Sequence, residues 1–239
     1  MNQSTELMKT SLLFLAGAAL VGTVQITSAG DVSGKVTLKG TSKAEVNIDL
    51  GPACGKVNPG KPTTRHYVVG SDGGLANVFV YIKDATKTDP KGDAPTLDQV
   101  GCMYEPYIMG VVTGQKFKIR NSDPELHNVH ATPKINAEFN FGQPVKGQVN
   151  EKRFDKAEVL VRMKCDVHPW MFAYVGVVDH PYFAVTDKDG NFKISGLPDG
   201  KYTIEAYHLK THTAKGLGIE KPIEVKGEVK QDFTVELAP

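Results

Sequence analysis

The sequence has little net charge, few cysteines and no long apolar run after residue 24. Its 28 basic and 27 acidic side chains leave a net charge of +1, which indicates neither a nucleic acid nor an anionic membrane as partner. The G-x-S-x-G, P-loop and H-E-x-x-H motifs are absent, so no common hydrolase, nucleotide-binding or metalloprotease signature is present. With 40% hydrophobic residues and frequent Gly and Pro, the composition indicates a β-rich globular protein.

Residues 1–30 have the pattern of a secretory signal peptide. Lys9 precedes an apolar run from Leu12 to Val24, and the small residues Thr27-Ser28-Ala29 form a cleavage site. We therefore expect a periplasmic or secreted protein whose mature chain has no membrane span. A retained N-terminal anchor is the alternative. The remaining residues 31–239 are enough for one large or two small domains.

The segment from residue 159 to 179 places three metal-binding side chains within seven residues. Mostly apolar and polar residues alternate over residues 159–164, so the thiol of Cys165 faces the apolar side at the end of a strand. His168 and Met171 follow in a His-Pro-Trp-Met turn, after which a second strand begins. Thiolate, imidazole and thioether are three of the four donors of a blue copper site, which needs a second histidine.

The segment N-S-D-P-E-L-H-N-V-H-A, residues 121–131, offers two candidates for that histidine. His127 and His130 lie three positions apart, so in an extended strand they point to opposite faces. One ion is therefore expected to bind only one of them.

With these residues the chain resembles the cupredoxins, and its loop C-D-V-H-P-W-M is similar to that of amicyanin. The resemblance covers residues 76–180 and implies a Greek-key β-sandwich with one type 1 copper ion. The ligands that it implies are His127, Cys165, His168 and Met171. Asn128 matches the asparagine that hydrogen-bonds across to the cysteine loop, and His130 is expected beside the ligands or at the surface, as the alternative to His127. Ordinary packing of a buried thiol and a nucleophilic pair of Cys165 with His168 remain as other interpretations.

The chain has three cysteines, an odd number that needs an explanation in an exported protein. If Cys165 binds the metal, Cys54 and Cys102 remain, and an oxidising compartment would allow them to form a disulfide. Two free thiols are the alternative, because spacing alone does not determine connectivity.

Residues 181–239 have a different pattern, in which two Asp-Gly turns separate short alternating strands. The motif T-D-x-D-G-x-F-x-I-x-G-L-P-x-G-x-Y-T resembles the carboxypeptidase regulatory-like, or transthyretin-like, β-sandwich. The opening strands of that family, V-x-G-x-V and L-A-N-V-x-V-Y, occur far upstream at residues 32–36 and 75–81. We therefore predict an all-β chain with two sandwiches. Two arrangements are open for residues 31–75. They are either the first part of a sandwich that the copper domain splits, or the beginning of the first of two tandem domains.

The predicted ligand set favours electron transfer over catalysis. A thiolate, two imidazoles and a weak thioether suit neither Cu(I) nor Cu(II) fully, so a one-electron change needs little rearrangement. The only other close histidine pair, His208 and His212, indicates at most a weak second metal site. We therefore predict an electron carrier that is not an enzyme. A copper-binding or delivery protein and a scaffold or adhesion module with a degenerate site are the rival hypotheses.

The resemblance also suggests how electrons would enter and leave. By analogy with cupredoxins they would pass through His168, and Pro169, Trp170 and Phe172 would form an apolar docking patch. Packing of Trp170 under the loop is the alternative. The amicyanin-like loop suggests redox partners such as a periplasmic dehydrogenase and a c-type cytochrome.

Overall fold

The computed structural model describes residues 28–210 and 218–237. The predicted signal peptide lies almost entirely outside this range, and so does His212. Within the described residues no helix is long and apolar enough to cross a membrane. Their regular structure consists of strands and one seven-residue helix, α1 (Gly51–Val57), which confirms the predicted all-β class.

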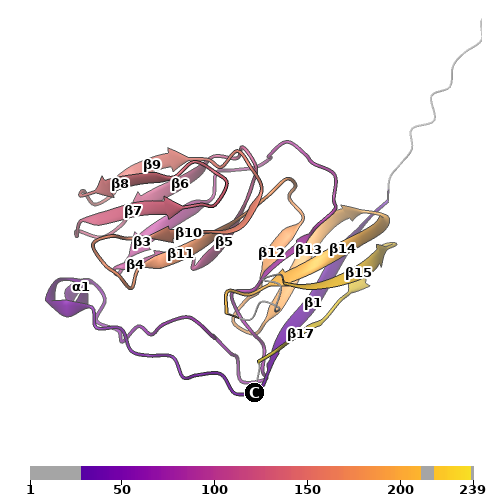
Figure 1. Cartoon of the computed structure of the whole chain (residues 1–239), viewed down its shortest axis with the longest axis horizontal. Coiled ribbons are helices and arrows are strands. Elements are labelled where there is room, and N and C mark those ends of the chain that lie inside the picture. Colours follow the sequence, from indigo (N-terminus) through magenta and orange to yellow (C-terminus); the bar gives the residue numbers. More distant parts are fainter. Residues whose placement is uncertain (1–27, 211–217, 238–239) are drawn as a thin grey trace, which may run out of the picture.

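The first sandwich, which carries Cys165, has two facing sheets (Figure 1). One sheet has the order β5 (Ile108–Val112), β11 (Phe172–Val178), β10 (Glu158–Lys164), β7 (His127–Thr132) and β8 (Phe139–Gln143). The other has the order β4 (Met103–Glu105), β3 (Thr96–Val100), β6 (Phe117–Asn121) and β9 (Val149–Lys152). Alternate residues of these strands, such as Phe117 and Ile119, meet in one core cluster between the sheets.

The second sandwich is built from strands at both ends of the described chain. One sheet contains β13 (Asn191–Pro198), β1 (Ala29–Lys39), β16 (Val229–Lys230) and β17 (Phe233–Glu236). The other has the order β12 (Phe183–Val185), β2 (Phe79–Ile82), β14 (Gly200–Tyr207) and β15 (Ile219–Val225). A separate apolar cluster fills the space between them.

The two strands that precede the first sandwich in sequence both pair with strands that follow it. In β1, Val36 lies beside Phe233, and in β2, Val80 lies beside Ala206. This is the pairing that a sandwich split by an insertion requires, since two tandem domains would leave β1 and β2 out of the C-terminal sheets. Residues 79–82, which the sequence analysis includes in the 76–180 unit, therefore lie in the second sandwich.

The strand β2 also joins the two sandwiches, because both of its faces are buried. Val80 and Ile82 belong to the core of the second sandwich, whereas Phe79 and Tyr81 belong to a cluster shared with β5 and β11 of the first. A strand buried on both faces reads as a continuous apolar run, as N-V-F-V-Y-I does. Close approach is possible because the facing position on β11 is Gly176, where an added Cβ would lie 2.4 Å from Cζ of Phe79.

We expect Gly176→Ala to lower the free energy of unfolding by about 1–3 kcal/mol, because Phe79 is fully buried and the new methyl group would displace its ring. Denaturant titration of the metal-free protein measures this. The matched control is Gly142→Ala on β8, where the nearest atom to an added Cβ is 3.9 Å away. Equal midpoints for the two variants would contradict the close packing of Phe79 on β11.

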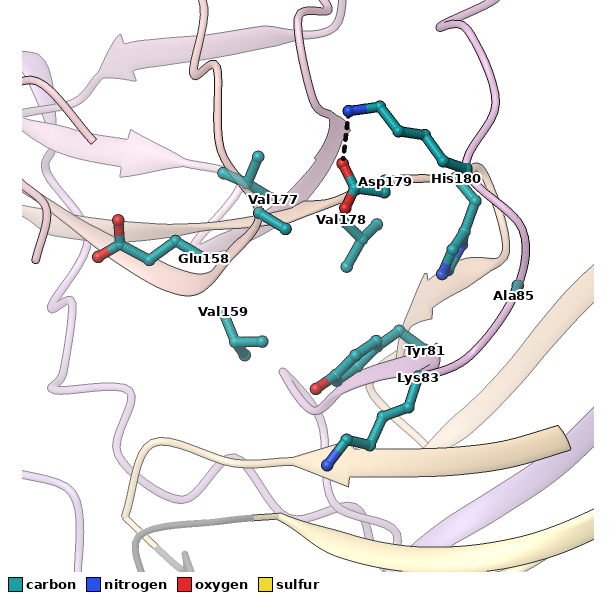
Figure 2. A pocket seen from close by; sticks show the side chains of 11 residues that line it. Tyr81, Lys83, Ala85, Glu158, Val159, Val177, Val178, Asp179 and His180 are labelled. Carbon is teal, nitrogen blue, oxygen red and sulfur yellow. Dashed lines mark ion pairs between the residues drawn. The ribbon is translucent and has the colours of Figure 1, made fainter. Parts of the chain in front are cut away.

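A cavity of about 240 Å³ lies at the same junction, between Tyr81 and Lys83 on one side and Val159 and Val177 on the other (Figure 2). Its charged groups already have partners within the chain. Lys83 contacts Glu220 at 2.5 Å, Lys87 lies 3.4 Å from Asp179, and the carboxylate of Glu158 accepts the N–H of Lys134 at 2.6 Å. We therefore assign no ligand to the cavity.

His208, at the end of β14, is a buried histidine whose protonation opposes folding. Its side chain is 3% exposed, and its ring packs against Tyr67. Burial lowers its pKa to about 4, and the positive charge of Lys210 and the ring of His66 act in the same direction, whereas Glu45 opposes them. The folded chain thus binds this proton only at a pH well below that at which the unfolded chain binds it.

We expect stability to fall as the pH drops from about 6.5 to about 4, because only the unfolded state takes up the proton in that window. The loss from this group approaches about 3 kcal/mol, since each pKa unit corresponds to about 1.4 kcal/mol. His208→Gln should remove this component, which is seen as a shallower fall of the unfolding free energy between the two pH values. An unchanged slope would contradict the burial of a neutral imidazole.

Candidate metal centre

The loop that joins β10 to β11 brings three sequence-predicted ligands together. Lys164 pairs with Phe172 at the strand ends, and the backbone N–H of Cys165 donates to the carbonyl of Met171 at 3.0 Å. The N–H of Met171 donates in turn to the carbonyl of His168 at 2.9 Å, which closes the loop as a tight turn. Cys165 and Met171 are both buried in the core cluster of the first sandwich. The turn therefore holds His168 next to the buried Cys165 and Met171 at the strand ends.

His127, the first residue of β7, faces this loop from the neighbouring strand. Its Nδ1 lies 3.1 Å from Nδ1 of His168, and Nδ1 of His168 lies 3.7 Å from Sγ of Cys165. The donor atoms of these three residues all lie within 4.8 Å of one another. The structure thus brings His127, Cys165 and His168 to one point, with Met171 buried beside them.

Asp123 determines which nitrogen of His127 carries the proton. This carboxylate is 3% exposed and accepts the backbone N–H groups of Gly101 and Cys102, each at 2.7 Å. Its Oδ2 also lies 2.9 Å from Nε2 of His127. Since a carboxylate only accepts, Nε2 bears the hydrogen and Nδ1 of the neutral ring presents its lone pair to the site.

The second imidazole has the same orientation. Nε2 of His168 lies 3.4 Å from Sγ of Cys54, and its Nδ1 faces Nδ1 of His127. Two nitrogen lone pairs and a sulfur therefore converge on one point, where only a proton or a metal cation can hold them together. The donor set fits a soft or borderline cation with thiolate and imidazole ligands.

The pKa values in the metal-free chain agree with this arrangement. Burial alone would lower the pKa of His127, but the hydrogen bonds with Asp123 and Cys165 outweigh it and raise the value to about 8. Burial would raise the pKa of Cys165, yet hydrogen bonds from His127 and from backbone N–H groups, including that of Asn128, lower it. These hydrogen bonds therefore stabilise the thiolate, the form in which cysteine binds metals, against the effect of burial.

Asn128 and His130 both contact the cysteine loop, but in different ways. The backbone N–H of Asn128 points at Sγ of Cys165 at 3.4 Å, and its Oδ1 accepts the N–H of Asp166 at 3.1 Å. His130 lies on the opposite face of β7, as its spacing from His127 predicts. Its ring nitrogens contact the carboxylates of Asp166 at 2.9 Å and Glu138 at 2.7 Å. His130 therefore steadies the outer side of the loop and does not face the three donors.

The three residues predicted for docking differ in exposure. Pro169 is exposed, whereas Trp170 and Phe172 are half-buried. Nε1 of Trp170 donates to the carbonyl of Cys102 at 3.1 Å, so this indole is partly engaged in packing. Exposed apolar side chains occur instead next to the two histidines, at Leu126 (48%) and Val167 (49%).

The predicted disulfide between Cys54 and Cys102 is confirmed, with the two Cα atoms 5.7 Å apart. It attaches α1 to the segment before β4 and lies directly against His168. Sequence reasoning did not identify this contact, nor the role of Asp123. The motif N-x-D-x-x-x-H contains Asp123 four positions before His127, which is the only local signal for it.

The fold and the site define an all-β chain with a candidate thiolate–imidazole metal centre at the end of one sandwich. No family model and no curated protein matches the chain. Three solved structures are similar to one part of it. A methionine-to-alanine mutant of amicyanin in its Cu(I) form is 22% identical, with 41% of this chain and 97% of that chain covered and a TM-score of 0.32.

A purple cupredoxin from Nitrosopumilus maritimus is 22% identical, with coverage of 36% of this chain and 99% of that chain and a TM-score of 0.30. A copper-containing nitrite reductase from Thermus scotoductus SA-01 is 17% identical, with 42% of this chain and 25% of that chain covered and a TM-score of 0.32. The likeness concerns the fold of one part of the chain only.

We expect Asp123→Asn to weaken metal binding by about 10- to 100-fold, the usual effect of losing the partner that orients a ligating histidine. Asp123 accepts N–H groups from Gly101, Cys102 and His127. An asparagine amide has only one acceptor oxygen, so its NH₂ group would face one of these donors and that hydrogen bond would be lost. Loss of the negative charge should also raise the reduction potential of a bound redox metal. Competition with a chelator and potentiometry measure both effects. Asp155→Asn, at an exposed aspartate, is the control, and equal affinities for the two variants would contradict the role of Asp123.

Proposed function

We propose that the chain holds one type 1 copper ion between Cys165, His127, His168 and Met171 and acts as an exported one-electron carrier. The main support is the convergence of Nδ1 of His127 and Nδ1 of His168, 3.1 Å apart, beside the sulfur of Cys165. A catalytic thiol would need only one histidine as base, whereas two imidazoles meet the sulfur of one cysteine in this chain.

Copper in such a ligand set supplies one-electron chemistry with little change of geometry. The residues of this chain supply the rigidity. Asp123 holds the ring of His127, the N–H of Asn128 points at the thiolate, and pairing of β10 with β11 fixes both ends of the loop. Because these contacts are buried or belong to the strand ladder, the donors cannot rearrange freely when the charge of the site changes.

Partners and location belong to the same proposal. A carrier of this kind would serve redox proteins outside the cytoplasm, such as a periplasmic dehydrogenase and a c-type cytochrome, to which the exported N-terminal pattern gives access. The exposed Leu126 and Val167, together with Pro169, lie next to ligands and would form the apolar part of a weak docking surface. His168 is half-buried here, and its Nε2 is covered by Cys54, so its ring is less open than the cupredoxin analogy implies.

The test is an absorption spectrum combined with a copper count. Protein loaded with one equivalent of Cu(II) should be intensely blue, lose the colour with ascorbate and regain it with ferricyanide. Colourless protein that retains copper through this cycle would favour a delivery protein over a carrier. Failure to retain copper would leave the scaffold hypothesis and reject the proposed centre.

A further inference from the structure

A second set of metal-binding atoms lies on the far side of His168. Nε2 of His168, Sγ of Cys54 and Sγ of Cys102 all lie within 4.8 Å of one another. Cys54 is 1% exposed and Cys102 is fully buried, and the contact between Cys54 and His168 measures 3.4 Å. In the disulfide these sulfurs are poor ligands, but two thiolates and an imidazole are the donors that soft metals such as Cu(I) prefer.

We propose that reduction of the Cys54–Cys102 disulfide opens a second site, which binds Cu(I) through the two thiolates and Nε2 of His168. His168 would then bridge the two centres as an imidazolate, with Nδ1 on the first and Nε2, which loses its proton, on the second. This site goes beyond the carrier function, and it does not require Cys165.

The backbone geometry suits both states of the two cysteines. Two sulfurs bound to one ion at about 2.3 Å each are at most about 4.6 Å apart. The Cα atoms of Cys54 and Cys102 are 5.7 Å apart, so rotation about the two Cα–Cβ bonds can separate the sulfurs by that amount. The third donor, on His168, already lies within 4.8 Å of both sulfurs, so one ion between them could reach all three.

The chemical step is a thiol–disulfide exchange followed by metal binding. A dithiol reductant breaks the bond between the two sulfurs, which together gain two electrons and two protons, and the reductant leaves as its own disulfide. Cu(I) then displaces three protons to solvent, one from each thiol and one from Nε2 of His168, and forms two thiolate bonds and one bond to that nitrogen.

The segment that carries Cys54 can give a reductant access. Figure 1 shows α1 at the tip of the long connection between β1 and β2. The two arms of this connection pair with each other, for example through the bridge between Asn47 and Thr63. The connection is also held to the first sandwich, where Leu50 joins the core cluster and Nδ2 of Asn58 donates to the carbonyl of Gly101 at 2.9 Å. A reductant therefore reaches the buried disulfide when this segment opens locally.

The experiment counts copper under anaerobic conditions. Protein is treated with a phosphine reductant, desalted and titrated with Cu(I) in the presence of a competing chelator, while untreated protein is titrated in parallel. We expect one copper per untreated chain and two per reduced chain. The Cys54→Ser/Cys102→Ser variant should bind one copper with or without the phosphine.

A Cys165→Ser background separates this inference from the proposed function. There, untreated protein should bind no Cu(I) tightly and reduced protein should bind one. Adding His168→Gln to this background should weaken Cu(I) binding by about tenfold or more, since a lost ligand costs at least as much as a lost partner of a ligand. Equal affinities would overturn the assignment of His168.

A reduced wild-type chain that binds no more copper than the untreated chain would overturn the second site, even if the untreated protein is blue. Conversely, colourless untreated protein whose Cys165→Ser variant gains one Cu(I) on reduction would reject the carrier and keep the second site. Circular dichroism of the reduced chain before copper addition must show the native strand signal. Loss of that signal would also overturn the proposal, because the site needs the folded spacing of the two cysteines.

Discussion

Replacing Cys165 with serine is expected to abolish the blue colour of the copper-loaded protein completely. The colour of a type 1 centre depends on a copper–thiolate bond, and Cys165 is the free cysteine of the chain. A serine hydroxyl is neither soft nor ionised at neutral pH, so it cannot replace the thiolate. The hydrogen bonds that lower the pKa of the Cys165 thiol stabilise the thiolate form, which serine cannot supply.

The measurement is the visible spectrum at equal copper and protein concentrations. Val167→Ser is the matched control, since it adds the same hydroxyl to the same loop at a side chain that is 49% exposed. It should keep the colour and the copper stoichiometry. A blue Cys165→Ser protein, or a colourless Val167→Ser protein, would contradict the ligand assignment.

The part of the candidate site that could be predicted from sequence is the part that is local. Cys165, His168 and Met171 lie within one seven-residue loop, so their spacing alone suggests that they converge. Alternation indicated that His127 and His130 face opposite sides, and the resemblance to cupredoxins selected His127; the observed burial of β7 follows the same alternation. In each case the relevant information lies in a few neighbouring residues.

The contacts that tune the site were harder to predict than the ligands. Cys54 reaches His168 across 114 positions of sequence, through a segment without regular strands that is held by the disulfide. Asp123 is only four positions from His127, but its orientation also depends on the distant backbone N–H groups of Gly101 and Cys102. Alternation predicts which face of a strand a residue occupies, but not which distant loop covers that face.

The same limit applies to the fold. The alternating runs at residues 32–36, 191–194 and 201–207 are predicted strands and are strands in the structure. The apolar run around β2 fits a strand buried on both faces, yet sequence alone cannot say which sheets bury it. Its partners, β12 and β14, lie about a hundred residues further along, so the assignment to the second sandwich required the pairing itself.

Removing the disulfide is expected to cost more stability than any other substitution considered, while leaving the first metal centre coloured. The two cysteines are 48 positions apart, and closing a loop of that length in the unfolded chain corresponds to about 4 kcal/mol. For a chain of this size we expect the unfolding midpoint of metal-free Cys54→Ser/Cys102→Ser to fall by about 10 °C. Calorimetry of the metal-free protein measures this, with the double variant compared with untreated wild type.

Phosphine-treated wild type is the control for side-chain chemistry, because it lacks the same cross-link but keeps both sulfurs. If loop closure is the cause, its midpoint should match that of the double variant. A midpoint within about 2 °C of the untreated wild type for both would show that the connection around α1 is held by other contacts, such as that of Asn58 with Gly101. Loss of colour in a folded double variant would instead mean that Cys54 is required to orient His168. That result would show that the disulfide is a part of the first metal centre as well as a stabilising cross-link.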